Sequence, residues 1–170
     1  MSMRYHWRSL VGALVLSYLT AGIGGALTDL GPWYQALKQP DWKPHDMWFG
    51  PIWTTIFTLA AISGWLAWHS APTARQRRRV VMLFALNAVL NVGWSALFFA
   101  LHRPDWSMVE WGFLWLSVAS LVIGLWPISR TAALLNLPYW VWVSIAGVLN
   151  WANVVLNGPF GVRADVIKVL

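Results

Sequence analysis

The sequence contains no cysteine and few charged residues, and both shortages restrict what the chain can do. Without cysteine it forms no disulfide framework, no thiolate metal site and no thiol chemistry. Only 11% of the 170 residues are charged, against about 25% in soluble proteins, whereas 58% are hydrophobic. So few charges cannot cover a water-soluble surface, and the composition therefore indicates an integral membrane protein.

Signatures of catalysis, metal binding and nucleic-acid binding are also missing. No Ser–His–acid set at usable spacing, no paired carboxylates and no glycine-rich phosphate loop is present. The four histidines (His6, His45, His69 and His102) lie on different connections, so no metal site is expected. The net charge of +6 comes from residues between long apolar segments, which is typical of topology signals rather than of nucleic-acid binding.

Long apolar segments are what the sequence has in abundance. Five of them approach the length of about 20 residues that a helix needs to cross a bilayer: 7–27, 48–68, 80–101, 107–126 and 132–156. The first is longer than the apolar core of about 7–15 residues in a signal peptide, so it is expected to stay as a helix. The sequence therefore predicts an all-α integral membrane protein, a five-transmembrane-helix bundle in a single domain over 1–170.

The basic residues predict an orientation for this bundle. One side would carry Arg4, Arg8, the compact run Arg75–Arg79 and Arg130, and the other Lys38, Lys43, Arg103, Arg163 and Lys168. The positive-inside rule then predicts a cytoplasmic N-terminus and an outward-facing first loop. The rule applies to a bacterial cell membrane, and an outer or organellar membrane remains an alternative.

The stretch Trp33–Trp53 is rich in tryptophan and proline and lies between the first two apolar segments. Pro40 and Pro44 donate no backbone hydrogen bond and disfavour helix in the residue before them. We therefore predict a structured lid loop, with Trp42, Pro44 and His45 in its middle. The alternative is an ordinary aromatic belt at the membrane surface.

Polar side chains recur at helical spacing in two of the apolar segments. They form one face with Asn87, Asn91 and Trp94, and a second with Trp142, Ala146, Asn150 and Asn153. Carboxamides are costly in a bilayer unless they are paired, so both faces should point into the bundle. The asparagines could simply join helices. The tryptophan on each face favours instead a cavity for a large, planar, mostly apolar ligand.

Small residues recur every four positions in the first segment, at Ala13, Ser17, Ala21 and Gly25. Such a stripe lets helix backbones approach closely in lipid. We expect it to pack inside the bundle, with a dimer contact as the alternative.

Three blocks of residues together resemble the TspO/MBR family, that is, the tryptophan-rich sensory proteins and the translocator protein or peripheral benzodiazepine receptor. The first block contains Trp33-Tyr34, Leu37-Lys38, Pro40, Trp42, Pro44 and Gly50-Pro51-Ile52-Trp53; the second contains Leu90–Trp94 and Phe98-Phe99; the third contains Pro138-Tyr139, Trp142, Ala146, Leu149-Asn150 and Asn157. The blocks keep their order and spacing over most of the chain.

The resemblance implies a five-helix homodimer whose pocket lies beneath the first loop. It implies binding of porphyrins and haem as ligands, with no required cofactor, in tetrapyrrole regulation or stress responses. Family members also bind sterols and benzodiazepine-site ligands. The pocket residues implied by the motifs are Trp33, Trp53, Asn87, Asn91, Trp94, Trp106, Trp142, Ala146 and Asn150. Some family members degrade protoporphyrin in light, for which Trp53 and Trp142 are the candidates here.

Two departures from the family pattern modify these expectations. His45 replaces the second proline of the lid motif, and is expected to be an exposed histidine without a special role. Trp151 and Val155 replace the tyrosine and the basic residue of the sterol-type pattern, which makes sterol binding less expected than porphyrin binding. The function predicted is thus a tetrapyrrole receptor or carrier. The alternatives are a porphyrin-degrading enzyme and a sterol-binding or scaffold membrane protein.

Overall fold

The computed structural model describes residues 6–161, which form helices and loops without a strand. The helices are α1 (His6–Leu27), α2 (Pro32–Ala36), η2 (Asp46–Trp48), α3 (Phe49–Ser70), α4 (Ala74–Ser95), η3 (Ala96–Ala100), α5 (Pro104–Leu125), α6 (Arg130–Leu134) and α7 (Leu137–Asn157). Of the basic residues used for the orientation, Arg4, Arg163 and Lys168 lie outside the described residues.

Five stretches of helix are long and apolar enough to cross a membrane. They comprise α1, η2 with α3, α4 with η3, α5, and α6 with α7. The predicted five-helix membrane architecture is therefore confirmed, and the protein is a multi-pass integral membrane protein.

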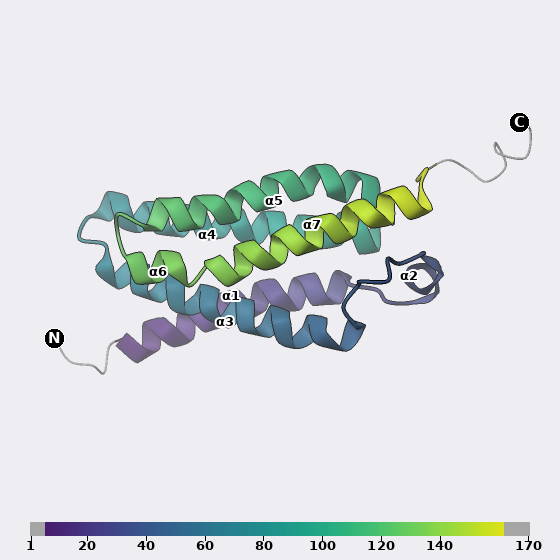
Figure 1. Cartoon of the computed structure of the whole chain (residues 1–170). Coiled ribbons are helices and arrows are strands. Elements are labelled where there is room, and N and C mark those ends of the chain that lie inside the picture. The colour runs from purple at the N-terminus through teal and green to yellow at the C-terminus, as the bar shows by residue number, and fades with distance from the viewer. Residues whose placement is uncertain (1–5, 162–170) are drawn as a thin grey trace, which may run out of the picture.

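The helices form a bundle whose two ends differ (Figure 1). The start of α1 and the short helix α6 lie at one end, and α2 lies at the other, near the end of α7. Around the bundle, α1 packs against α3 and α4, α4 packs against α5, and α5 packs against α7. Helix α3 also packs against α6, whereas α7 packs mainly against α5.

Helix α4 begins six residues before the apolar segment predicted from 80. Thr73 and Gln76 form a capping box, in which each side chain bonds the backbone N–H of the other. This cap satisfies amides at the helix start. The arginines that follow are good helix formers. The polar first turns therefore extend a helix whose apolar part alone was visible in the hydropathy pattern.

The fifth predicted segment, 132–156, is not one continuous helix, which corrects the sequence prediction. It divides into α6 and α7 around Leu135 and Asn136. Pro138 lies in the first turn of α7, where its missing N–H is tolerated, but it could not continue a helix from α6. The fully buried Asn136 fixes the break, because its Nδ2 lies 2.8 Å from Ser63 Oγ and 2.9 Å from Ala132 O.

The α4 helix ends in the π-helical turn η3 rather than in a regular α-helical turn. The turn places the adjacent Phe98 and Phe99 in buried positions, with ring centroids 4.8 Å apart. Widened turns of this kind often occur at functional sites. Here the turn lies directly beneath the short helix α2, whose Tyr34 packs on Phe99.

Candidate functional site

A cavity of about 440 Å³ lies between α1, α3, α4, η3 and α7, beneath the loop between α1 and α3. We call residues 28–48 the lid. The lid contributes Leu30, Tyr34, Gln39 and Asp46 to the cavity wall. The volume of the cavity is within the range of about 300–1,000 Å³ that is typical of small-molecule sites.

Aromatic side chains line the cavity from three sides. Trp53 of α3 packs on Phe57, one helical turn later, with the ring centroids 5.6 Å apart. On the α4 side, Trp94 stacks on Phe98 at 5.2 Å and meets Phe99 edge-on at 6.0 Å. These rings therefore offer flat apolar faces to an occupant of the cavity.

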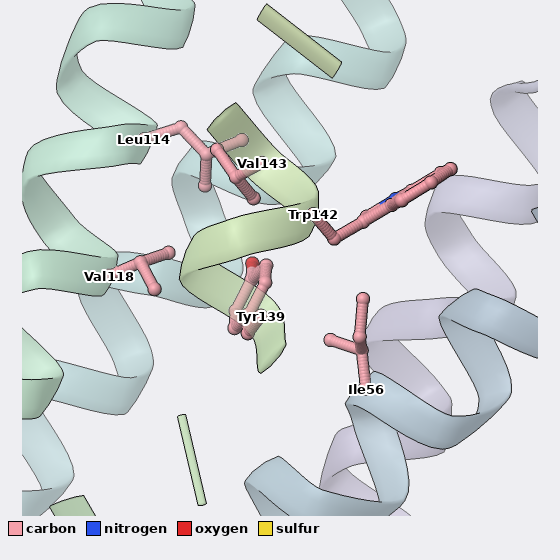
Figure 2. Close-up of a cluster of buried hydrophobic side chains, with 6 residues drawn as sticks. All are labelled: Ile56, Leu114, Val118, Tyr139, Trp142 and Val143. Atoms are coloured by element: carbon pink, nitrogen blue, oxygen red, sulfur yellow. The ribbon is translucent and has the colours of Figure 1, made fainter. Parts of the chain in front are cut away.

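Trp142 supplies the third aromatic wall and is held in place by the hydrophobic core. Figure 2 shows Trp142 projecting from α7 on the side away from Leu114 and Val118, while Tyr139 lies one turn earlier beside Ile56. Trp142 is buried, and its ring meets Phe49 edge-on at 5.5 Å. Because α7 is anchored on α5, the indole is positioned by a packed core rather than by a loop.

The asparagines of the two predicted faces differ in what they bind. Asn91 lines the cavity, and its Nδ2 donates to Tyr139 Oη at 3.0 Å. Asn150 lies at the cavity wall but bonds the first turn of α5 through Ser107 Oγ at 2.9 Å. With its amide turned over, Asn150 also satisfies Pro104 O and Met108 N. Asn150 thus joins α7 to α5.

Four buried polar atoms of the cavity wall have no hydrogen-bond partner within the described part of the chain. They are Oε1 and Nε2 of Gln39, Nε1 of Trp142 and Oδ1 of Asn153. Leaving such a buried atom unsatisfied costs about 1–3 kcal/mol, so native structures rarely keep several together. The cavity therefore offers both donors and acceptors to a ligand that is otherwise apolar.

One set of contacts holds the lid together, and another fastens it to the bundle. Near its middle, Tyr34 Oη donates to Asp46 at 3.0 Å, and Lys43 Nζ lies 2.5 Å from the same carboxylate and 5.2 Å from the Tyr34 ring centroid. At the end of α7, Asn157 accepts from the Lys38 backbone N–H at 2.7 Å and donates to the Lys38 carbonyl at 2.9 Å. The lid is thus a bonded cover rather than a loose loop.

The lid's ionisable groups are shifted in the directions that keep it closed. Burial raises the pKa of Tyr34, so its phenol stays protonated and can donate. Burial acts to lower the pKa of Lys43, but the hydrogen bonds to Asp46 and Tyr34 outweigh it and raise that pKa overall. Lys43 is therefore a cation over the whole neutral range.

Six of the nine predicted pocket residues line the cavity: Trp53, Asn91, Trp94, Trp142, Ala146 and Asn150. Trp33 instead stacks on His102 at 4.1 Å, because α2 turns its ring across the top of η3. Asn87 lies one turn away from Asn91 and bonds Ser117 Oγ at 2.9 Å. Trp106 is half-exposed at the start of α5, with the Arg103 guanidinium 4.1 Å from its ring centroid.

The three lid residues singled out from the sequence, Trp42, Pro44 and His45, also lie outside the cavity wall. Trp42 is 51% exposed, and Pro44 is half-buried without lining the cavity. His45 is exposed, and its Nδ1 accepts from the Met47 N–H at the start of η2. The predicted exposure of His45 is confirmed, and its lack of a special role stays a prediction.

Several wall residues were not predicted from the sequence, notably Tyr34, Gln39, Asp46, Phe57 and Phe98. Phe57 and Phe98 follow Trp53 and Trp94 at a spacing of four, which was a usable signal. Gln39 and Asp46 had none, because their positions depend on the path of an irregular loop.

Together, the fold and the cavity define a five-span membrane protein with an aromatic, lid-covered cavity inside its bundle. The chain belongs to the TspO/MBR family, whose model matches residues 11–156. It is 34% identical to the protein CrtK of Rhodobacter capsulatus over 81% of this chain and 86% of that protein. It is 33% identical to the tryptophan-rich protein TspO of Chlorobaculum tepidum, over 82% and 90% respectively. The human translocator protein is 26% identical over 70% of this chain and 71% of its own length.

Proposed function

We propose that the cavity beneath the lid binds a porphyrin-type tetrapyrrole, protoporphyrin or haem. The protein would then act as a membrane receptor or carrier, with a sensory role in tetrapyrrole metabolism or stress. The observation that carries the proposal is the combination of three aromatic walls with unpartnered polar atoms on Gln39, Trp142 and Asn153. A porphyrin has the matching make-up, since its flat apolar ring carries polar groups at the edge.

The polar atoms of the wall suit the edge groups of the macrocycle. A propionate can accept from the Gln39 amide or the Trp142 indole N–H, and a protonated acid can donate to the Asn153 oxygen. Each such bond would also remove the cost of a buried, unpartnered atom. A sterol, with one hydroxyl, would leave most of these atoms unpartnered.

Iron is not needed for this mode of binding. Among the described residues, no histidine or methionine lines the cavity, and the chain has no cysteine. The hydroxyls of the two wall tyrosines, Tyr18 and Tyr34, are bonded to Thr58 and Asp46. Affinity would therefore come from the ring faces and edge groups, which protoporphyrin and haem share. We expect the two to bind with dissociation constants within about tenfold of each other, a difference of about 1.4 kcal/mol.

A titration in the dark tests the proposal. Protoporphyrin is added to the detergent-solubilised protein while tryptophan fluorescence and the Soret band are recorded. Trp142→Phe removes one wall N–H, and Asn91→Ala removes a carboxamide from the cavity wall, so each should weaken binding by about three- to tenfold. Trp106→Phe is the matched control, because Trp106 lies outside the cavity. Unchanged affinity in both cavity variants would reject the assigned pocket.

A second candidate function is light-dependent degradation of the bound porphyrin. Trp53 and Trp142 both lie in the cavity wall, where either indole could give an electron to a photoexcited ring. This reading requires product formation under illumination to fall in a Trp53→Phe, Trp142→Phe double variant that still binds porphyrin. Bleaching at the wild-type rate in that variant would reject it.

The remaining features of the family are also proposals for this chain. Trp151 and Val155, which replace the sterol-type pattern, are exposed on α7 at 58% and 63%, so any sterol contact there would lie outside the cavity. Binding of benzodiazepine-site ligands would use the same aromatic walls as the porphyrin. A homodimer with cytoplasmic arginines, in a bacterial cell membrane, is the assembly we propose.

A further inference from the structure

We propose that a second cavity, at the opposite end of the bundle from the lid, binds one acyl chain of an anionic glycerophospholipid, whose headgroup contacts Arg77. This cavity is a groove of about 590 Å³ between α1, α3 and α4. It does not depend on porphyrin binding, because Phe57 is the one wall residue that it shares with the lid cavity among the described residues.

Small residues on all three helices form the groove. The floor includes Gly12 and Ala13 of α1, Ala61 and Gly64 of α3, and Ala88 of α4. Along α1 the groove runs from Ser9 to Ile23, which corresponds to about 21 Å at about 1.5 Å per residue. A groove of this length could hold a single extended hydrocarbon chain.

The groove opens toward the surface that would face lipid. On its rim, Leu16, Leu19 and Val81 are exposed at 68%, 58% and 53%. Inside a bilayer there is no bulk water to fill such a space. Membrane lipid is therefore the molecule present at the opening.

Polar groups within the groove are satisfied by the protein itself, unlike those of the lid cavity. Ser17 Oγ donates to Phe57 O at 2.7 Å, Thr20 Oγ1 donates to Leu16 O at 3.1 Å, and Asn87 donates to Ser117. The groove therefore offers a mainly apolar surface to an occupant. The groove thus suits an acyl chain, and an edge-substituted ring such as porphyrin would find few partners there.

A basic side chain stands at the end of the groove. Arg77 lies one turn before Val81 and two turns before Phe84 on α4, and both of these residues line the groove. Its guanidinium lies 5.5 Å from the ring centroid of Trp68, another groove residue, and its Nε donates to Ala71 O. Arginine has further N–H donors, arranged in a fork that matches a phosphate.

Acidic residues are absent from this end within the described part of the chain. The described carboxylates, Asp29, Asp41, Asp46, Asp105 and Glu110, belong to the lid side or to the first half of α5. The arginine-rich end carries Arg8, Arg75, Arg77, Arg78, Arg79 and Arg130. An anionic headgroup would balance this charge, whereas a neutral headgroup would not.

Pairs of arginine and tryptophan mark the level of the headgroups at this end. Arg8 lies 5.9 Å from the ring centroid of Trp7, and Arg130 lies 5.7 Å from that of Trp126, in addition to Arg77 on Trp68. Amphipathic rings of this kind lie at the membrane–water boundary. The headgroup of a lipid whose chain fills the groove would therefore be at the height of Arg77.

Lipid retention by the full chain tests the headgroup contact. The protein is equilibrated in micelles with equal amounts of dioleoyl phosphatidylglycerol and dioleoyl phosphatidylcholine, and native mass spectrometry records the lipid that remains bound. We expect one lipid per chain, with phosphatidylglycerol preferred about fivefold, the effect of one basic residue near a membrane surface. Arg77→Gln should abolish the preference. Arg79→Gln should keep it, because Arg79 lies against Gly124 of α5.

A second pair of variants tests the groove. Gly12→Leu fills it, because no heavy atom lies within 4 Å of a Cβ placed at Gly12, and retention of both lipids should fall at least tenfold. Gly112→Leu on α5 is the matched control, since its surroundings are equally open and it lines neither cavity. Ala85→Leu, on the α4 wall, repeats the test if Gly12→Leu does not fold.

Three results would overturn the inference. Equal retention of the two lipids by the wild type would remove the headgroup contact. Equal retention by the Gly12→Leu and Gly112→Leu variants would place bound lipid elsewhere. If the Gly12→Leu variant no longer formed a dimer but retained bound lipid, the groove would be the contact site for a second copy of the chain. Loss of porphyrin binding alone would leave the lipid inference standing.

Discussion

A single methyl group at Gly147 should destabilise the bundle where α7 meets α5. A Cβ placed on Gly147 would lie 2.1 Å from Cε2 and 2.4 Å from Nε1 of Trp111. That indole donates to the Val143 carbonyl, one turn earlier on α7, at 2.8 Å. Gly147→Ala therefore cannot be accommodated unless the Trp111 ring moves and its hydrogen bond weakens.

The size of the effect can be worked from these contacts. Overpacking a tight core costs about 1–3 kcal/mol, and the lost hydrogen bond costs about 0.5–1.5 kcal/mol. The higher helix propensity of alanine stabilises the folded state by about 1 kcal/mol relative to glycine. The free energy of unfolding should thus fall by about 0.5–3.5 kcal/mol. Because Ala146 adjoins Gly147 and lines the lid cavity, porphyrin affinity should fall as well.

Thermal unfolding in detergent, followed by far-UV circular dichroism, measures the change. Gly112→Ala on α5 is the matched control, because a Cβ there meets no heavy atom within 4 Å. The control should be as stable as the wild type or up to about 1 kcal/mol more stable. If Gly147→Ala unfolds at the temperature of Gly112→Ala, the packing described for Trp111 is wrong.

The remaining predictions concern the lid cavity. Ala146→Phe should fill the lid cavity and lower porphyrin affinity at least tenfold with little change in melting temperature. Wild-type affinity of this variant in the protoporphyrin titration would argue against the assigned site. Asn157→Ala removes both hydrogen bonds to Lys38, so porphyrin should dissociate about tenfold faster in stopped-flow fluorescence. An unchanged rate would show that these two bonds do not control the exit of the ligand. The pKa values of Lys43 and Tyr34 are raised above their usual 10.5 and 10.0, so the charged lysine and the protonated phenol stabilise the lid fully below pH 10.0. That contribution is lost as the pH rises through the raised values, so dissociation should accelerate above pH 10.5 in the wild type and accelerate less in Lys43→Met, where Tyr34 alone still titrates.

The sequence was sufficient for the spans and for the residues whose positions follow from helical periodicity. Asn91, Trp94 and Trp142 face the cavity because their helices are straight enough there for spacing to define a face. The same periodicity points Asn87 into the bundle, as predicted, but not into the lid cavity. One turn of helix displaces a side chain by about 5.4 Å, which takes Asn87 out of the lid cavity and into the second groove.

Features that depend on irregular backbone could not be derived in this way. The stacking of Trp33 on His102 depends on the path of the lid, which has no period to read. The unpartnered atoms of Gln39 are buried for the same reason. The break at Asn136 could have been found from Pro138, but hydropathy alone joined α6 and α7 into one segment.

The measurement that tests the central claim most directly is an experimental structure of the full chain with protoporphyrin bound in the dark. Our account predicts one macrocycle beneath the lid, with its ring against Trp53, Trp94 and Trp142 and a polar edge group at Gln39 or Trp142 Nε1. A macrocycle in the groove between α1, α3 and α4, or on the outer surface of the bundle, would contradict it.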